Sequence, residues 1–255
     1  MKLIDSHCHL YSSEFKNDIE EVIQRAETEG VQSFFLPAID SGSFDDMLQL
    51  EEKYPGKCIA MMGLHPCSVK ENYKEELLIV ENWLQKRKFA AIGEIGLDFY
   101  WDKSHTKQQD EAFRIQIEWS ILYNLPIIIH TRNAMQETIR IIKEYSPQNI
   151  KGIFHCFSGS YEDAKAIIDM GFYLGIGGVV TYKNSGLAEV VDKIGLEHLV
   201  LETDSPYLSP VPYRGKRNES SYLKYIVEKL ATIKKAGIEE VASVTTTNAQ
   251  KIFGY

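Results

Sequence analysis

Short apolar segments alternate with longer amphipathic segments along almost the whole chain. The apolar segments are rich in Ile, Val and Phe and have the length of buried strands, whereas the segments between them have a helical period. The strand candidates are KLID (2–5), VQSFFLPA (31–38), CIAMMGLH (58–65), FAAIGEIG (89–96), PIIIH (126–130), KGIFHCF (151–157), FYLGIGG (172–178) and HLVLETD (198–204). This alternation is typical of repeated βα units.

Two of the amphipathic segments carry clear core-facing stripes of apolar residues at helical spacing. The first stripe comprises Phe15, Ile19, Val22, Ile23 and Ala26, and the second comprises Leu223, Ile226, Val227, Leu230 and Ile233.

Eight strand-helix units in a chain of 255 residues predict an α/β fold of the TIM-type (β/α)8 barrel class. No linker rich in Pro, Gly and Ser divides the sequence, so we expect a single domain over residues 1–255. An open doubly wound sheet is the alternative. It is disfavoured because no glycine-rich phosphate loop follows the first strand, and the G-x-G of YLGIGG comes late in the chain.

Polar residues stand at the carboxyl ends of five strand candidates. His7 and His9 are two residues apart, so on an extended chain both side chains point the same way, while Cys8 points to the opposite side. The other strand-end residues are Glu94, His130, His155 and Asp204. Taken singly, each histidine could be a hydrogen-bonded structural residue, and each carboxylate could cap a helix.

The combination of these residues predicts a metal site. The carboxyl ends of parallel strands meet at one end of a barrel, so four imidazoles and two carboxylates would gather there. Without a cation, such a group would contain unpaired polar atoms and repelling charges. The predicted metal ligands are His7, His9, Glu94, His130, His155 and Asp204.

Composition limits the partners that the protein can hold. A net charge of −8 and a pI near 5.5 argue against a broad cationic surface, so a polyanion would be bound locally or through cations. The four cysteines are scattered without a C-x-x-C pair, which favours a reducing compartment. No signal peptide and no membrane span is recognisable. We therefore expect a cytoplasmic protein that does not enter the membrane.

Seven motifs in a fixed order resemble those of one enzyme family. They are DSHCHL, GLHP, GEIGLDFY, LPIIIHTRNA, HCFSGS, GGVVTYKN and ETDSPYLSPVPYRGKRNE. Together they resemble the TatD-type metal-dependent deoxyribonucleases of the amidohydrolase superfamily, over essentially the whole chain. By this resemblance, the metal ligands of the family correspond to the same six residues. Two positions depart from the pattern of many members, which have aspartate at Asn133 and proline at Ser220.

The fourth strand carries the residue that we expect to bridge two cations. Related amidohydrolases often use a carboxylated lysine on this strand. Here the strand carries Glu94, and its nearby lysine, Lys88, lies at the opposite end. The expected arrangement assigns His7, His9 and Asp204 to one cation, His130 and His155 to the other, and Glu94 to both.

Two divalent cations, chosen among Mg, Mn, Zn, Co and Ni, suit phosphodiester hydrolysis because they activate water and stabilise both oxygens of a phosphoryl displacement. By the resemblance to TatD-type enzymes, we expect an exonuclease acting on DNA. Glu94 and Asp204 are the expected catalytic residues, with Asp204 as the general base. His65 lies at the same end and would contact the phosphate or the leaving oxygen, or else make a supporting hydrogen bond.

Two other classes of function remain open at this point. The same metals could polarise a carbonyl, as in an amidohydrolase or an aminoacyl-tRNA deacylase. A binding module that has lost turnover is disfavoured, because all six expected ligands are intact.

A cationic stretch follows Asp204 and is the expected contact for DNA. In SPYLSPVPYRGKRNE (205–219), Arg214, Lys216 and Arg217 lie close to two tyrosines. The cations would neutralise phosphates and the tyrosines would stack on unpaired bases, so we expect single-stranded ends as the substrate. The alternative is a solvated charge run with no ligand. No protein partner and no oligomeric state can be inferred from the sequence.

Overall fold

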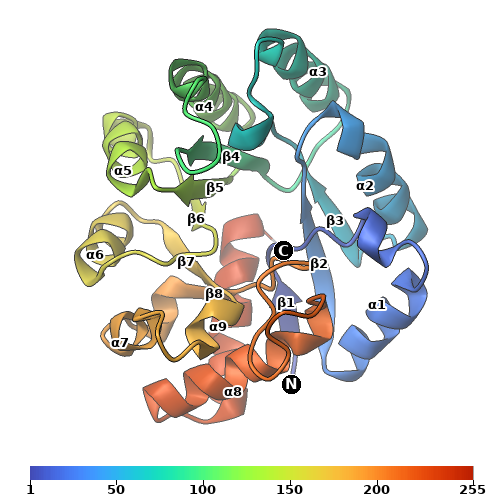
Figure 1. The fold of residues 1–255 in the computed structure, drawn as a ribbon, viewed down its shortest axis with the longest axis vertical. Helices are drawn as coiled ribbons and strands as arrows, with labels where there is room; N and C mark the ends of the chain where they lie inside the picture. Colours follow the sequence, from blue (N-terminus) through green and yellow to red (C-terminus); the bar gives the residue numbers. More distant parts are fainter. Residues whose placement is uncertain (255) are drawn as a thin grey trace.

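Eight parallel strands at the centre of the molecule confirm the predicted barrel (Figure 1). The structure is a computed structural model that describes residues 1–254. The strands are β1 (Leu3–Asp5), β2 (Val31–Pro37), β3 (Cys58–Met61), β4 (Ile92–Asp98), β5 (Ile127–Arg132), β6 (Gly152–Phe154), β7 (Tyr173–Ile176) and β8 (Leu199–Leu201).

Each strand pairs with its neighbours in chain order, in two sheets of three and five strands. Two further contacts close the ring. Met62 forms a parallel bridge with Ile92, which joins β3 to β4, and the backbone N–H of Ser6 donates to the carbonyl of Leu201 at 3.0 Å, which joins β1 to β8.

Helices surround the strands, as Figure 1 shows. They are α1 (Ile19–Thr28), α2 (Ser41–Lys53), α3 (Tyr73–Lys86), α4 (Thr106–Tyr123), α5 (Met135–Glu144), α6 (Tyr161–Asp169), α7 (Leu187–Asp192), α8 (Leu223–Lys234) and α9 (Ile238–Phe253). The predicted stripes face the core on α1 and α8. Phe15 is the exception: it is buried but belongs to a separate 3-10 turn, because the non-helical backbone of Asp18 intervenes before α1.

The interior of the barrel is apolar and is closed at the amino-terminal end of the strands by α9. The interior side chains are Ile4, Phe35, Ile59, Met61, Ala91, Ile128, Ile153 and Val200. Ala249 and Ile252 of α9 join this cluster, and the ring of Phe253 stacks on that of Phe35 at 3.7 Å. With this end filled by apolar side chains, polar groups gather at the opposite, carboxyl end of the strands.

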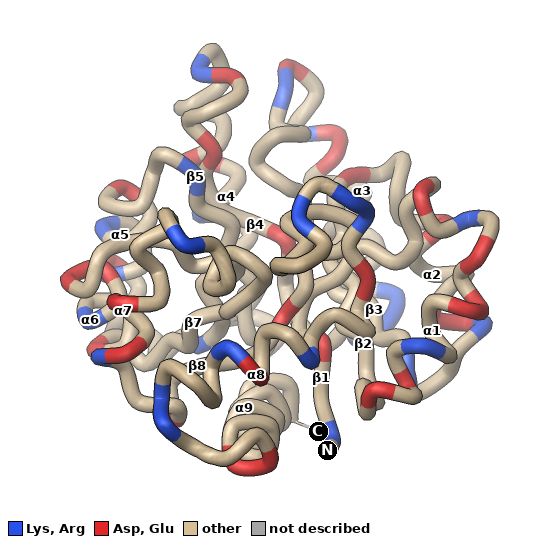
Figure 2. Tube along the Cα trace, turned by 60° about the horizontal axis from the view of Figure 1, so that its bottom comes forward, with Lys and Arg blue, Asp and Glu red and all other residues tan. Residues whose placement is uncertain are grey.

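Charged residues of both signs are interspersed over the outer helices (Figure 2). This distribution agrees with the absence of a broad cationic surface that composition predicts. Within residues 1–254, no helix combines the length and the hydropathy that a bilayer span requires.

Candidate metal centre

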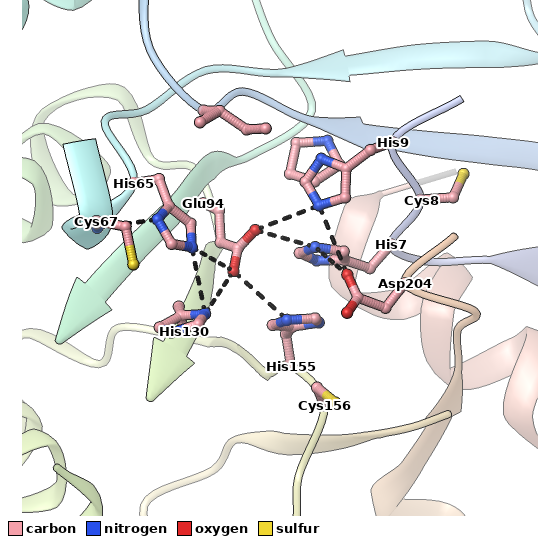
Figure 3. Close-up of polar contacts among 12 residues, drawn as sticks. His7, Cys8, His9, His65, Cys67, Glu94, His130, His155, Cys156 and Asp204 are labelled. Atoms are coloured by element: carbon pink, nitrogen blue, oxygen red, sulfur yellow. Dashed lines mark hydrogen bonds and ion pairs between the residues drawn. The ribbon is translucent and has the colours of Figure 1, made fainter. Parts of the chain in front are cut away.

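The chain delivers the six expected ligands to the carboxyl end of the barrel, although not always at a strand terminus. Glu94 is the third residue of β4, which continues to Asp98, so the prediction that Glu94 stands at the carboxyl end of this strand is wrong. His7 and His9 lie beyond β1, which ends at Asp5. Their side chains nevertheless point to the same side, while Cys8 turns away into the core (Figure 3).

The remaining expected ligands come from three other strands. His130 lies inside β5, His155 directly follows β6, and Asp204 lies three residues beyond β8. Asp204 has a left-handed backbone with φ 56°, a conformation that aspartate tolerates better than most residues. All six side chains are brought into one cluster.

Glu94 occupies the middle of this cluster and is only 2% exposed (Figure 3). Its Oε2 atom lies 3.1 Å from Nε2 of His7 and 3.7 Å from Nε2 of His9. Its Oε1 atom lies 2.9 Å from Nδ1 of His130 and 3.4 Å from Nε2 of His155. The two oxygens of one carboxylate therefore face different groups of imidazoles.

Asp204 completes the side of the cluster that contains His7 and His9. Its Oδ1 atom lies 3.7 Å from Nε2 of His7 and 3.5 Å from Nε2 of His9. His155 also belongs to this side, because the ligand atoms of His7, His155 and Asp204 all lie within 4.8 Å of one another. His155 thus lies between the two groups of ligands.

Hydrogen bonds behind two of the histidines orient a nitrogen lone pair towards the cluster. The Tyr11 hydroxyl donates to the carbonyl of Pro37 at 2.6 Å, so its oxygen accepts from Nδ1 of His9 at 2.9 Å. Asp98 accepts from Nε2 of His130 at 2.9 Å. A neutral imidazole that donates through one nitrogen has a free lone pair on the other, which is the form that binds metals.

His155 fits the same requirement, whereas His7 has no such supporting bond. Glu202 accepts from Nδ1 of His155 at 3.1 Å, which leaves Nε2 of His155 facing Glu94. His7 is fully buried and stacks on His155 at 3.6 Å. Its Nε2 atom makes only the ion-pair contacts with Glu94 and Asp204 described above, and neither of its ring nitrogens forms a hydrogen bond within residues 1–254. Buried polar atoms rarely remain unpaired, so the donor set fits bound cations.

His65 has the opposite orientation. Its Nδ1 atom accepts from the backbone N–H of Cys67 at 3.0 Å, so in the neutral ring the proton is on Nε2. That atom lies 3.3 Å from Oε1 of Glu94. His65 is therefore arranged as a hydrogen-bond donor beside the cluster, and its tautomer does not suit metal ligation.

The charges of the cluster shift its pKa values strongly. Burial would raise the pKa of Glu94, but His65, His7 and His155 hold this pKa well below its ordinary range. Burial lowers the pKa of His155, whereas Glu202 and Glu94 oppose it and raise this pKa to about 10. Burial together with the charge of His155 lowers the pKa of His7. A cation that binds to His155 must therefore displace a proton.

An open cavity of about 530 Å³ lies above the cluster. Its lining includes His65, as expected, and also Trp101 and Arg132, which the sequence did not single out. Arg132 ends β5 two residues after His130, and this position on the same face of the strand was a signal for it.

The predicted DNA-binding cations lie outside the lining of this cavity. Arg217 makes a bidentate ion pair with Asp18 at 2.7 and 2.6 Å, which attaches the loop to the residue before α1. The guanidinium of Arg214 lies 4.4 Å from the ring of Tyr182, and the ammonium of Lys216 lies 5.9 Å from the ring of Tyr213. Neither Arg214 nor Lys216 has an ion pair within the described residues.

Comparison with known proteins identifies the family. The family described as TatD related DNase matches residues 4–254. The chain belongs to the TatD family. It is 42% identical to the uncharacterized metal-dependent hydrolase YabD of Bacillus subtilis, over 98% of each chain.

Other TatD proteins support the same assignment. The chain is 31% identical to a Pantoea ananatis protein named 3'-5' ssDNA/RNA exonuclease TatD, over 99% of each chain. Its fold matches the crystal structure of YJJV, a TatD homolog of Escherichia coli, with a TM-score of 0.93 and 29% identity over 99% and 98% of the two chains. The resemblance to the TatD family and the barrel fold are therefore confirmed, and the protein is a TatD-family metal-dependent hydrolase.

Proposed function

We propose that this TatD-family hydrolase is a deoxyribonuclease that removes nucleotides from single-stranded DNA ends. The observation that carries the proposal is the position of Glu94, whose two oxygens face two separate groups of imidazoles beneath an open cavity. The name of the Pantoea ananatis relative supports a nucleic-acid substrate.

In this proposal the ligands divide into two sets that share one carboxylate. When bound, two divalent cations (Mg, Mn, Zn, Co or Ni) would supply Lewis-acid activation of water and would neutralise charge on the phosphate. The proposed assignment is His7, His9 and Asp204 for one cation, His130 and His155 for the other, and Glu94 for both.

Asp204 acts as the general base. Burial would raise the pKa of the Asp204 carboxyl, but a hydrogen bond with His9 and the charges of His155 and His7 keep this pKa below its ordinary value. The carboxylate is therefore ionised at neutral pH. It lines the cavity and accepts a proton from the attacking water. The water oxygen bonds to phosphorus, the bond from phosphorus to the leaving oxygen breaks, and the leaving oxygen takes up a proton from solvent. His65 donates a hydrogen bond from Nε2 to a phosphate or leaving oxygen.

Arg214 and Lys216 provide positive charge for the DNA strand outside the cavity, since neither is paired within residues 1–254. Arg217 has a different role in this proposal: its guanidinium is held by Asp18 and fixes the loop in place. Binding through two free cations predicts a modest salt dependence of DNA affinity.

The test is a product analysis with end-labelled single-stranded and double-stranded DNA. The purified protein is stripped of metal, reloaded with each of the five cations in turn, and compared with the stripped protein. We expect mononucleotide release from the single strand, and only after reloading. An aminoacyl ester serves as the comparison substrate. Release of the amino acid by a protein that leaves both DNA forms intact would replace the nuclease proposal with the deacylase alternative.

A further inference from the structure

Two exposed aromatic side chains lie side by side at the cavity of the metal centre. Tyr100 and Trp101 follow β4 and are 51% and 69% exposed. Their rings are 4.9 Å apart at an angle of 85°, and Trp101 lines the cavity. An exposed aromatic pair beside a functional cavity is typical of a binding surface, because its apolar faces gain by being covered.

A cation accompanies this aromatic pair. The guanidinium of Arg132 lies 3.8 Å from the ring centre of Tyr100 and 5.1 Å from that of Trp101, and Arg132 also lines the cavity. In the part of the chain that the structure describes, its guanidinium has no ion pair. Flat apolar faces next to a free cation are complementary to a base and its phosphate.

The backbone that carries the aromatic pair is attached to the metal centre through Asp98. One oxygen of Asp98 accepts from Nε2 of His130 at 2.9 Å, and the other accepts from the backbone N–H groups of Tyr100 at 2.9 Å and Trp101 at 3.2 Å. A second bond runs from the N–H of Phe99 to the carbonyl of Arg132 at 2.9 Å. The aromatic rings are therefore held at a fixed position relative to the ligand His130.

We infer that Tyr100, Trp101 and Arg132 form a stacking platform for the unpaired base next to the cleaved bond. The base stacks on Trp101, and Arg132 binds the neighbouring phosphate. Stacking requires a free base face, which a duplex hides, so the platform selects single strands. This inference rests on the proposed nuclease function, and it names the residue that positions the substrate for cleavage.

The test compares two single-stranded oligonucleotides with the metal-loaded enzyme. One has a normal base at every position, and the other has abasic nucleotides at both ends. For the wild-type enzyme we expect kcat/KM to be about 5-fold to 150-fold lower on the abasic substrate, the range for the loss of one base-aromatic stack. In Trp101→Ala this ratio of kcat/KM on the normal oligonucleotide to kcat/KM on the abasic oligonucleotide falls to within about twofold of unity. Trp101→Phe restores most of it, because phenylalanine still offers a ring.

Leu122→Ala is the matched control, since Leu122 is 71% exposed on α4 and lines no part of this cavity. It should keep the wild-type ratio. If Trp101→Ala also keeps the wild-type ratio on DNA that the enzyme cleaves, the platform proposal is refuted and the proposed nuclease function is unaffected. If the wild-type enzyme hydrolyses bis(p-nitrophenyl) phosphate but neither oligonucleotide, both the nuclease proposal and the platform proposal are refuted.

Discussion

Glu202→Gln removes one negative charge from behind His155 while keeping the size of the side chain. Glu202 is fully buried, and its Oε1 atom accepts from Nδ1 of His155 at 3.1 Å and from the backbone N–H of Cys156. Loss of such a supporting carboxylate typically costs 10-fold to 100-fold in metal affinity, or about 1.4 to 2.8 kcal/mol. The variant also lowers the pKa of His155, which favours the metal. The cation carries twice the charge of the proton that it displaces, so loss of the carboxylate weakens metal binding more than it weakens proton binding. We therefore expect a lower net metal affinity.

The assay is competition for Zn²⁺ between the protein and a chromophoric chelator at constant pH. Glu197→Gln is the matched control, because Glu197 is exposed on the turn before β8. We expect the control to bind like the wild type, and both variants to keep the wild-type circular dichroism spectrum. Wild-type affinity in folded Glu202→Gln would refute the role that we give to the hydrogen bond on His155.

Four further outcomes follow from the site and the loop. Asp204→Asn should lower kcat more than it changes KM for DNA, measured at saturating metal, as expected for a group that acts in the transition state. Apparent metal affinity should rise by up to about tenfold per pH unit between pH 7 and 9, because the proton on His155, with a pKa of about 10, must leave; a chelator titration at each pH measures this. Gly175→Ala would place a Cβ atom 2.2 Å from Oε2 of Glu202, and overpacking of this kind should lower the free energy of unfolding by about 1 to 3 kcal/mol in urea denaturation. Arg217→Ala should cost about 1 kcal/mol in the same assay, since its bidentate ion pair is partly exposed.

The sequence predicted the barrel and all six members of the cluster because both depend on regular patterns. Strand periodicity determines which side chains share a face, and parallel strands bring their carboxyl ends together. His7 and His9 could therefore be placed with Asp204, which is almost 200 residues away. Their roles as ligands stay a prediction.

The groups that orient the ligands were not predicted, because a hydrogen bond depends on side-chain rotamers that periodicity does not contain. Asp98 and Glu202 are the main examples. Positional signals existed for both: Asp98 lies four residues after Glu94 on β4, and Glu202 lies two residues before Asp204. Gly175 belongs to the G-x-G of YLGIGG and has a packing role, since its missing side chain leaves room for Glu202.

Cations were the hardest feature to interpret from the sequence. Arg217 belongs to a visible charge run, but its partner Asp18 lies 199 positions away and can only be found in three dimensions. Arg132 and Trp101 were not predicted as site residues, because neither belongs to a charge run or to an apolar stripe. Folding brings both to the wall of one cavity.

The most direct test of the central claim is the metal content of Glu94→Gln, measured by mass spectrometry on protein dialysed against Mn²⁺ or Zn²⁺, together with turnover of single-stranded DNA. A bridging carboxylate neutralises both cations, and a neutral amide cannot replace it. We predict two cations per chain in the wild type, at most one in Glu94→Gln, and no detectable turnover by the variant. A Glu94→Gln protein that retains two cations and wild-type turnover would contradict the account.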